Sequence, residues 1–257
     1  SYSSELIKGK NKAKKFANSV FNLLVFFLLV TTILIEIFMP GFVKVIAPGF
    51  SDDKEKMQLA INLTRLTFPF LLFICLASFL SAILNSHNKF AAAAAAPIIL
   101  NILLILCLML ANKFGDKLVY YLSYTVSIAG LVQFIFLIFF VRKFYLPNFN
   151  LKIKMNDNIK IFFKKFLPSI FASGVTQINI LVGTIIASFQ ASAVSYLYYA
   201  DRIYQINLAI AGIAIGTVIL PNLSRHIKNN NSLKTRELQN KALELSLFLS
   251  LPASLAL

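Results

Sequence analysis

Two charged residues, Asp201 and Arg202, lie between two long apolar segments of this chain, which cover residues 166–189 and 203–220. A charge inside a membrane-length segment costs at least about 2.5 kcal/mol unless it meets water or an opposite charge. We expect a helix to begin near Ser195, which places Arg202 about seven residues into it and roughly 10 Å below the membrane surface. No other basic residue of the sequence lies at that depth. Arg202 is therefore the first candidate for contact with a transported molecule.

The chemistry of Arg202 suits a phosphate or pyrophosphate, because a guanidinium group donates paired N–H groups to such anions. Asp201 points about 100° away around the helix and cannot pair with Arg202 within it, so each needs a partner elsewhere. The face of Arg202 continues through Gln205 and then carries only small residues: Ala209, Gly212 and Gly216. These either let another helix pack closely or leave volume below the guanidinium. Alternatively, Arg202 reaches the outer interface among three nearby tyrosines.

A polar stripe marks the apolar segment before Arg202. Its members recur at spacings of three, four or seven and so share one helix face: Ser173, Thr176, Gln177, Thr184 and Ser188. Hydrogen bonds between helices explain such a stripe, and so does the lining of a water-filled cavity, which the nearby Arg202 favours. The sequence has no paired carboxylates, metal-spaced His/Cys cluster, nucleophile with a base, or Gly-rich phosphate loop. We therefore expect no enzyme, no metal site and no cofactor.

The elements that must position these residues are membrane-spanning helices. Hydrophobic residues make up 58% of the 257-residue chain, against about 45–50% in soluble domains. Six apolar spans each reach the roughly 17–25 residues that a bilayer requires. They cover residues 18–39, 66–84, 91–111, 118–141, 166–189 and 195–223, and a seventh opens at 242. Backbone groups that face lipid must bond within their own segment, so the sequence predicts an all-α, polytopic transmembrane bundle.

The net charge of +15 follows the alternation of these spans. Eighteen of the 25 Lys and Arg residues fall in loops on one side, six fall in loops on the other, and Arg202 is the remainder. Basic loops stay in the cytoplasm, so the eighteen mark the cytoplasmic side. Topology alone explains the charge. We expect membrane lipids as neighbours and no nucleic acid as a partner.

The outer side carries three local predictions. Pro40-Gly41 is expected to end the first span, and Glu36, one turn earlier, is explained by its place at the interface. Ser51 is expected to cap a helix whose first turn holds three acidic residues, which the helix dipole favours. This helix is predicted to run unbroken to Leu84.

Several short motifs occur in order along nearly the whole chain. They are Ala47-Pro48-Gly49-Phe50, Thr67-Phe68-Pro69-Phe70, Ile83-Leu84-Asn85, Ala96-Pro97, Tyr198-Tyr199-Ala200-Asp201-Arg202 and Leu220-Pro221-Asn222-Leu223-Ser224. Each motif is modest, but the ordered set is specific. Together they resemble the MurJ (MviN) family of lipid II flippases, within the multidrug/oligosaccharidyl-lipid/polysaccharide exporter superfamily.

This resemblance implies two six-helix lobes around a cationic cavity, followed by two further helices. It also implies alternating access that carries lipid II, the undecaprenyl-pyrophosphate-linked peptidoglycan precursor, across a bacterial inner membrane. The chain would hold helices three to eight and the start of nine. Residues 1–141 would belong to the N-terminal lobe, 142–165 would form a basic cytoplasmic linker, and 166–257 would begin the C-terminal lobe.

The resemblance also assigns roles to residues. Arg202 matches a cavity arginine taken to bind the pyrophosphate, and Asp201 matches its acidic neighbour. The other cavity arginines belong to the first two helices, outside this chain, so the chain alone is not expected to transport. From the polar stripe and the helix face of Arg202, and not from the resemblance, the expected cavity lining is Ser173, Thr176, Gln177, Thr184 and Gln205. Gly183 stands near where some members carry an acidic sodium ligand, which argues against sodium coupling there.

Other functions stay open at this point. An exporter of another polyprenyl-linked saccharide, or a multidrug or cation antiporter of the same superfamily, is the main alternative. A membrane-bound transferase or phosphatase would need catalytic residues outside this sequence. A membrane scaffold would tolerate any isosteric replacement of Arg202.

Overall fold

The computed structural model describes residues 2–110, 113, 115–148, 174–175, 177–209, 223 and 232–256. Within these ranges the chain forms helices and no strand. The α-helices are α1 (Tyr2–Ile7), α2 (Lys10–Ile37), α3 (Met39–Ile46), α4 (Lys54–Thr67), α5 (Pro69–Ser86), α6 (Phe90–Met109), α8 (Leu118–Val141), α10 (Ala193–Asn207) and α12 (Ser232–Ala256). Two 3₁₀ turns, η1 (Pro48–Asp52) and η2 (Gly115–Lys117), and a helix over Gln177–Ser188 complete the described elements.

Four helical stretches are long and apolar enough to cross a membrane: Lys10–Ile37, Lys54–Ser86, Phe90–Met109 and Leu118–Val141. They correspond to the first four predicted spans, and the fourth agrees with the prediction at both ends. The fifth predicted span is described only over Gln177–Ser188, and the sixth only through α10. The predicted all-α, polytopic bundle is confirmed, and the protein is a multi-pass membrane protein.

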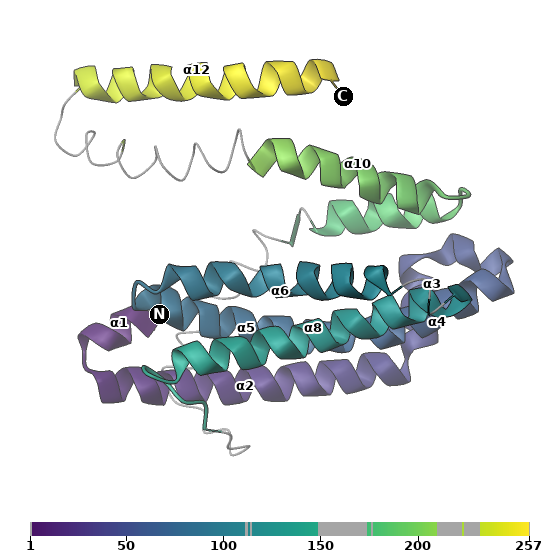
Figure 1. The fold of residues 1–257 in the computed structure, drawn as a ribbon, viewed down its shortest axis with the longest axis horizontal. Helices are drawn as coiled ribbons and strands as arrows, with labels where there is room; N and C mark the ends of the chain where they lie inside the picture. The colour runs from purple at the N-terminus through teal and green to yellow at the C-terminus, as the bar shows by residue number, and fades with distance from the viewer. Residues whose placement is uncertain are drawn as a thin grey trace. The chain divides into compact units, whose positions relative to one another are not determined.

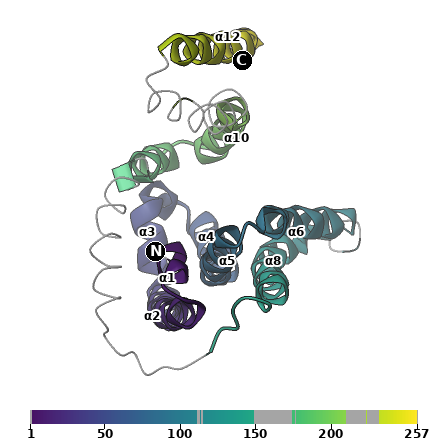
Figure 2. The same cartoon turned by 90° about the vertical axis from the view of Figure 1, so that its left-hand side faces the viewer.

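The chain divides into two compact units, residues 1–189 and 190–257. In the first unit, α5 packs against α2 on one flank and against α6 and α8 on the other, with the long helices side by side (Figures 1 and 2). Their shared core contains these buried side chains: Ala17, Ala77, Leu80, Ile83, Leu84, Ala96, Leu137, Val141 and Tyr145. The α2–α5–α8–α6 layer is thus a packed scaffold. The second unit is described by α10 and α12.

The ends of the first unit's helices that charge assigns to the cytoplasm meet one another. The Tyr2 hydroxyl lies 3.1 Å from Nε2 of His87, in the turn after α5. The His87 ring stacks on Phe144, just past α8, with centroids 4.2 Å apart. The backbone N–H of Asn148 donates to the Asn18 side chain at 3.3 Å. These contacts agree with the predicted alternation of sides.

Two boundaries on the outer side differ from the predictions. Ser51 does not cap the helix, because it lies within η1. Asp53 caps α4 instead, and its carboxylate accepts the Lys56 N–H at 3.0 Å. A carboxylate satisfies the free amides and also meets the positive end of the helix dipole, which explains the choice. The first span ends at Ile37, three residues before Pro40, and Pro40 itself lies in the first turn of α3, where its missing N–H is not needed.

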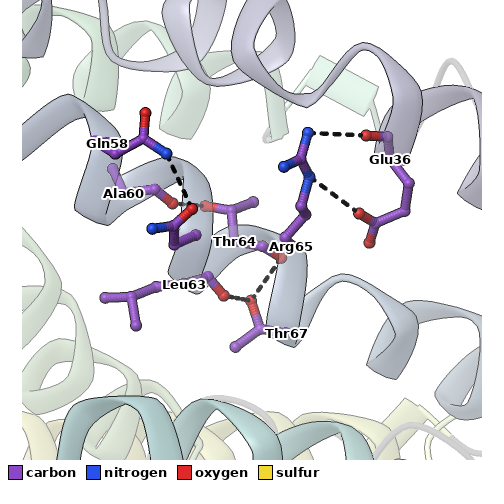
Figure 3. A network of polar contacts seen from close by, with 8 residues as sticks. Glu36, Gln58, Ala60, Leu63, Thr64, Arg65 and Thr67 are labelled. Carbon is purple, nitrogen blue, oxygen red and sulfur yellow. Dashed lines mark hydrogen bonds and ion pairs between the residues drawn. The ribbon is translucent and has the colours of Figure 1, made fainter. Parts of the chain in front are cut away.

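The predicted unbroken helix to Leu84 is interrupted at Phe68, between α4 and α5. Pro69 has no N–H to donate to the carbonyl of Arg65 one turn earlier, so the hydrogen-bond ladder loses a rung. In the same turn, the Thr67 hydroxyl donates to the carbonyls of Leu63 and Thr64 at 3.0 and 3.1 Å (Figure 3). Phe68 itself keeps helical angles of φ -60° and ψ -37°, so α4 and α5 still form one continuous stretch over Lys54–Ser86.

Candidate functional site

Helix α10 carries Asp201 and Arg202. It begins at Ala193, two residues before the predicted start, after Ser192 in the left-handed conformation with φ 62°. The helix continues through both charged residues to Asn207. Arg202 therefore lies within a regular helix, as the sequence predicts, but nine residues after its first residue instead of seven.

The Arg202 side chain is exposed within its unit. Its guanidinium carbon lies 4.8 Å from the centroid of the Tyr198 ring, one turn earlier on the same face. Such a cation–π contact leaves the N–H donors at the edge of the guanidinium plane free to bind. Neither of the two ion pairs found in the described part of the chain includes Arg202. Among those residues, its charge is not neutralised by an acid.

Asp201 points away from Arg202, as the helical spacing requires. One of its carboxylate oxygens, Oδ2, accepts a hydrogen bond from Nε2 of Gln205 at 2.6 Å. Gln205 is thereby directed toward Asp201, although it also lies one turn beyond Arg202. Within the described ranges, no three His, Cys, Asp or Glu side chains are placed to hold a metal ion.

The polar stripe is described only in part. Ser173 and Thr176 lie outside the described residues. Gln177 is exposed, and the Thr184 hydroxyl donates to the Ile180 carbonyl at 2.9 Å. The stripe belongs to the first unit and Arg202 to the second, so each is described by itself. The cavity-lining role of these residues remains a prediction.

Ser188, the last residue of the stripe, makes a packing contact that the sequence did not reveal. It is 2% exposed, donates to the Ile185 carbonyl at 2.7 Å and accepts the Gly49 N–H at 3.0 Å. A Cβ on Gly49 would collide with the backbone of Ser188 and Phe189. Two segments that charge places on the outer side thus meet, although 139 residues separate Gly49 from Ser188.

An ion pair on the outer side was also missed, since the interface alone was taken to explain Glu36. Nε of Arg65 lies 3.7 Å from Oε2 of Glu36, and Nη2 of Arg65 donates to the Glu36 carbonyl at 3.4 Å (Figure 3). The pair joins the end of α2 to the end of α4, next to the helix breaks at Phe38 and Phe68. The sequence did contain a signal for this ion pair, because Glu36 and Arg65 carry opposite charges and both lie near the outer ends of neighbouring spans.

Comparison with known proteins identifies the family. The model of the lipid II flippase MurJ family matches residues 1–257. A probable lipid II flippase MurJ of Rhizobium tropici is 41% identical over 254 residues, which cover 97% of this chain and 48% of that protein. Its counterpart in Rickettsia prowazekii (strain Madrid E) is 39% identical, covering 98% of this chain and 50% of that protein.

A solved structure agrees with these sequence matches. The lipid II flippase MurJ in an inward closed conformation superposes with a TM-score of 0.78 at 28% identity, covering 98% of this chain and 52% of that one. The chain spans about half the length of the curated relatives it matches. The resemblance drawn from the ordered motifs is confirmed, and the chain belongs to the lipid II flippase MurJ family.

Proposed function

We propose that the full-length protein flips lipid II from the cytoplasmic to the outer leaflet of a bacterial inner membrane by alternating access, and that Arg202 binds the pyrophosphate. The observation that carries the proposal is the guanidinium on α10 that stacks on Tyr198 and has no acidic partner among the described residues. Membership of the MurJ family supports the choice of substrate.

The local electrostatics of α10 support an anion at Arg202. Gln205 occupies one carboxylate oxygen of Asp201 through its hydrogen bond, and Asp201 lies on a different face, so it does not cancel the charge of Arg202. The ring of Tyr198 orients the guanidinium plane without using its donors. A planar fork of N–H groups matches the oxygens of a pyrophosphate bidentately, which an ammonium group does not.

The transport cycle assigns roles to the rest of the chain. Residues 1–141 belong to one lobe and 166–257 begin the other, and the two rock about the basic cytoplasmic segment 142–165. Ser173, Thr176, Gln177 and Thr184 line the polar path, with Asp201 and Gln205 beside the headgroup. No covalent bond changes in this cycle, so the protein is a transporter without enzymatic activity.

Complementation tests the proposal. The full-length gene is expressed in a bacterium depleted of its own lipid II flippase, as wild type, Arg202→Ala and Arg202→Lys, at matched membrane levels. We expect rescue by the wild type, failure of Arg202→Ala, and weak rescue by Arg202→Lys, because bidentate geometry is lost. Rescue by all three would remove Arg202 from the mechanism. A well-expressed wild type that fails to rescue would point instead to another lipid-linked saccharide.

A further inference from the structure

A pocket of about 470 Å³ opens at the cytoplasmic end of the first unit. It lies between the turn that joins α5 to α6 and the end of α8. These residues line it: Leu84, Asn88, Lys89, Phe90, Ala91, Ala92, Phe139, Phe140, Arg142, Lys143 and Phe144. None of them belongs to the proposed lipid II site, so the pocket calls for an explanation of its own.

The charge of this pocket is entirely positive. Lys89, Arg142 and Lys143 are exposed at its wall, and no acidic residue lines it. The guanidinium carbon of Arg142 lies 4.0 Å from the centroid of the Phe139 ring, which fixes the group at the rim. Neither ion pair in the described part of the chain includes these three cations. Their charge is complementary to an anion.

The start of α6 adds backbone donors to the same place. Lys89 is the N-cap residue, and its side chain makes no capping hydrogen bond. Ala91 and Ala92 in the first turn line the pocket. The first N–H groups of a helix have no partner within it, and they carry the positive end of the helix dipole. An anion held by the three cations would therefore also meet this helix end.

The remaining wall is aromatic and open. Phe90, Phe139 and Phe140 are 58%, 54% and 41% exposed. Each lies at the cytoplasmic end of a helix long enough to span the membrane. A small hydrophilic anion would leave these rings uncovered. A ligand with a phosphate head and a hydrocarbon tail would satisfy both parts of the pocket, because rings at this depth pack against acyl chains.

We propose that this pocket binds an anionic phospholipid of the cytoplasmic leaflet. The phosphodiester meets Lys89, Arg142, Lys143 and the N-terminus of α6, and an acyl chain lies along Phe139 and Phe140. Basic pockets between membrane helices on the cytoplasmic side suit such headgroups. The bound lipid joins the ends of α5, α6 and α8, next to the stack of Phe144 on His87. The proposal does not depend on the transported substrate.

A fluorescence measurement tests the site. The chain contains no Trp, so Phe140→Trp places a reporter in the pocket of the full-length protein, with any tryptophan elsewhere changed to Phe. The protein is reconstituted in phosphatidylcholine vesicles and quenched with brominated phosphatidylglycerol or brominated phosphatidylcholine. We expect phosphatidylglycerol to be preferred by about fivefold or more, since each nearby cation contributes about that factor. Changing Lys89, Arg142 and Lys143 together to Gln should reduce the preference to near one.

A matched control removes the same charge elsewhere. Lys12, Lys14 and Lys15 are exposed near the cytoplasmic end of α2, outside the pocket. Changing these three to Gln should leave the preference intact. If the pocket variant fails to fold, Lys89→Arg with Lys143→Arg should retain the preference and Arg142→Gln alone should lower it. Absence of any preference in the reporter protein, or equal losses in both triple variants, would overturn the proposal.

Discussion

Arg65 and Arg202 show two different uses of one side chain next to a membrane. Arg65 finds an acid within its own fold, Glu36, 29 residues earlier in the chain. Arg202 finds the ring of Tyr198, and neither ion pair in the described part of the chain includes it. The first arginine joins two helix ends. The second has no acidic partner among the described residues, which is why we propose Arg202, and not Arg65, as the arginine that binds an anionic ligand.

The largest expected difference is between two single variants, each of which removes one of the two guanidinium groups. Arg202→Gln in the full-length protein should weaken lipid II binding roughly tenfold to a hundredfold, because a charge-assisted hydrogen bond is worth about 1.5–3 kcal/mol. Arg65→Gln should leave that affinity unchanged. Titration of both purified variants with lipid II, with Kd as the readout, checks this. Equal losses in the two variants would erase the distinction between the two arginines.

A second comparison concerns the rigidity of the outer side. Gly49→Ala should lower the free energy of unfolding by about 1–3 kcal/mol, because its methyl group meets the backbone of Ser188 and Phe189, which cannot rotate aside. Gly41→Ala is the matched control, since nothing lies within 4 Å of a Cβ there. Thermal unfolding of both variants in detergent gives the comparison. A Gly49→Ala protein as stable as the control would show that this contact is loose.

A smaller effect is expected from the Glu36–Arg65 pair. Both side chains are partly exposed, at 28% and 44%, and such pairs are typically worth about 0–1 kcal/mol. Glu36→Gln and Arg65→Gln should each lower the unfolding temperature slightly, and the exchange Glu36→Arg with Arg65→Glu should restore part of the loss. The coupling between the two side chains is measured by comparing the sum of the two single losses with the loss in the variant that carries both Glu36→Gln and Arg65→Gln. Fully additive losses would mean that the pair does not join α2 to α4.

The smallest effect is a pH dependence at the cytoplasmic end. Burial, and secondarily the charge of Lys10, lowers the pKa of His87. The unfolded state then binds the proton more readily, so stability is complete above the ordinary His pKa of about 6.5 and declines as pH falls through the folded value. His87→Gln should flatten this decline between pH 7 and 5 in unfolding measurements. A decline unchanged in that variant would assign it to other groups.

Much of the fold was predictable because it follows from local patterns. Hydrophobic runs gave the first four spans, and the alternation of basic loops agrees with the contacts of His87 at one end and of Ser188 at the other. The 100° step between Asp201 and Arg202 correctly excluded a pair within the helix. Pro69 could have predicted the break at Phe68 from its missing N–H alone.

The partners of Glu36 and Gly49 were not predictable in the same way. Each lies far along the chain, at Arg65 and Ser188, and no periodicity encodes which distant segment returns to a given loop. Ser188 illustrates the difficulty, because its spacing placed it in a polar stripe while its environment made it a buried packing residue. The helix that carries Asp201 and Arg202 was predictable because its formation follows from a local pattern, whereas the role of these two residues remains a prediction.

The hydrogen bond from Gly49 to Ser188 also sets an order of events during biogenesis. At about 5–20 residues per second, roughly 7–28 s of synthesis separate the two residues, which are 139 positions apart. Gly49 therefore lacks this partner until the predicted fifth span has been synthesised and inserted. If that span entered in the opposite orientation, Ser188 would emerge on the other face of the bilayer and the bond could not form. This contact thus depends on correct insertion of every span between its two ends.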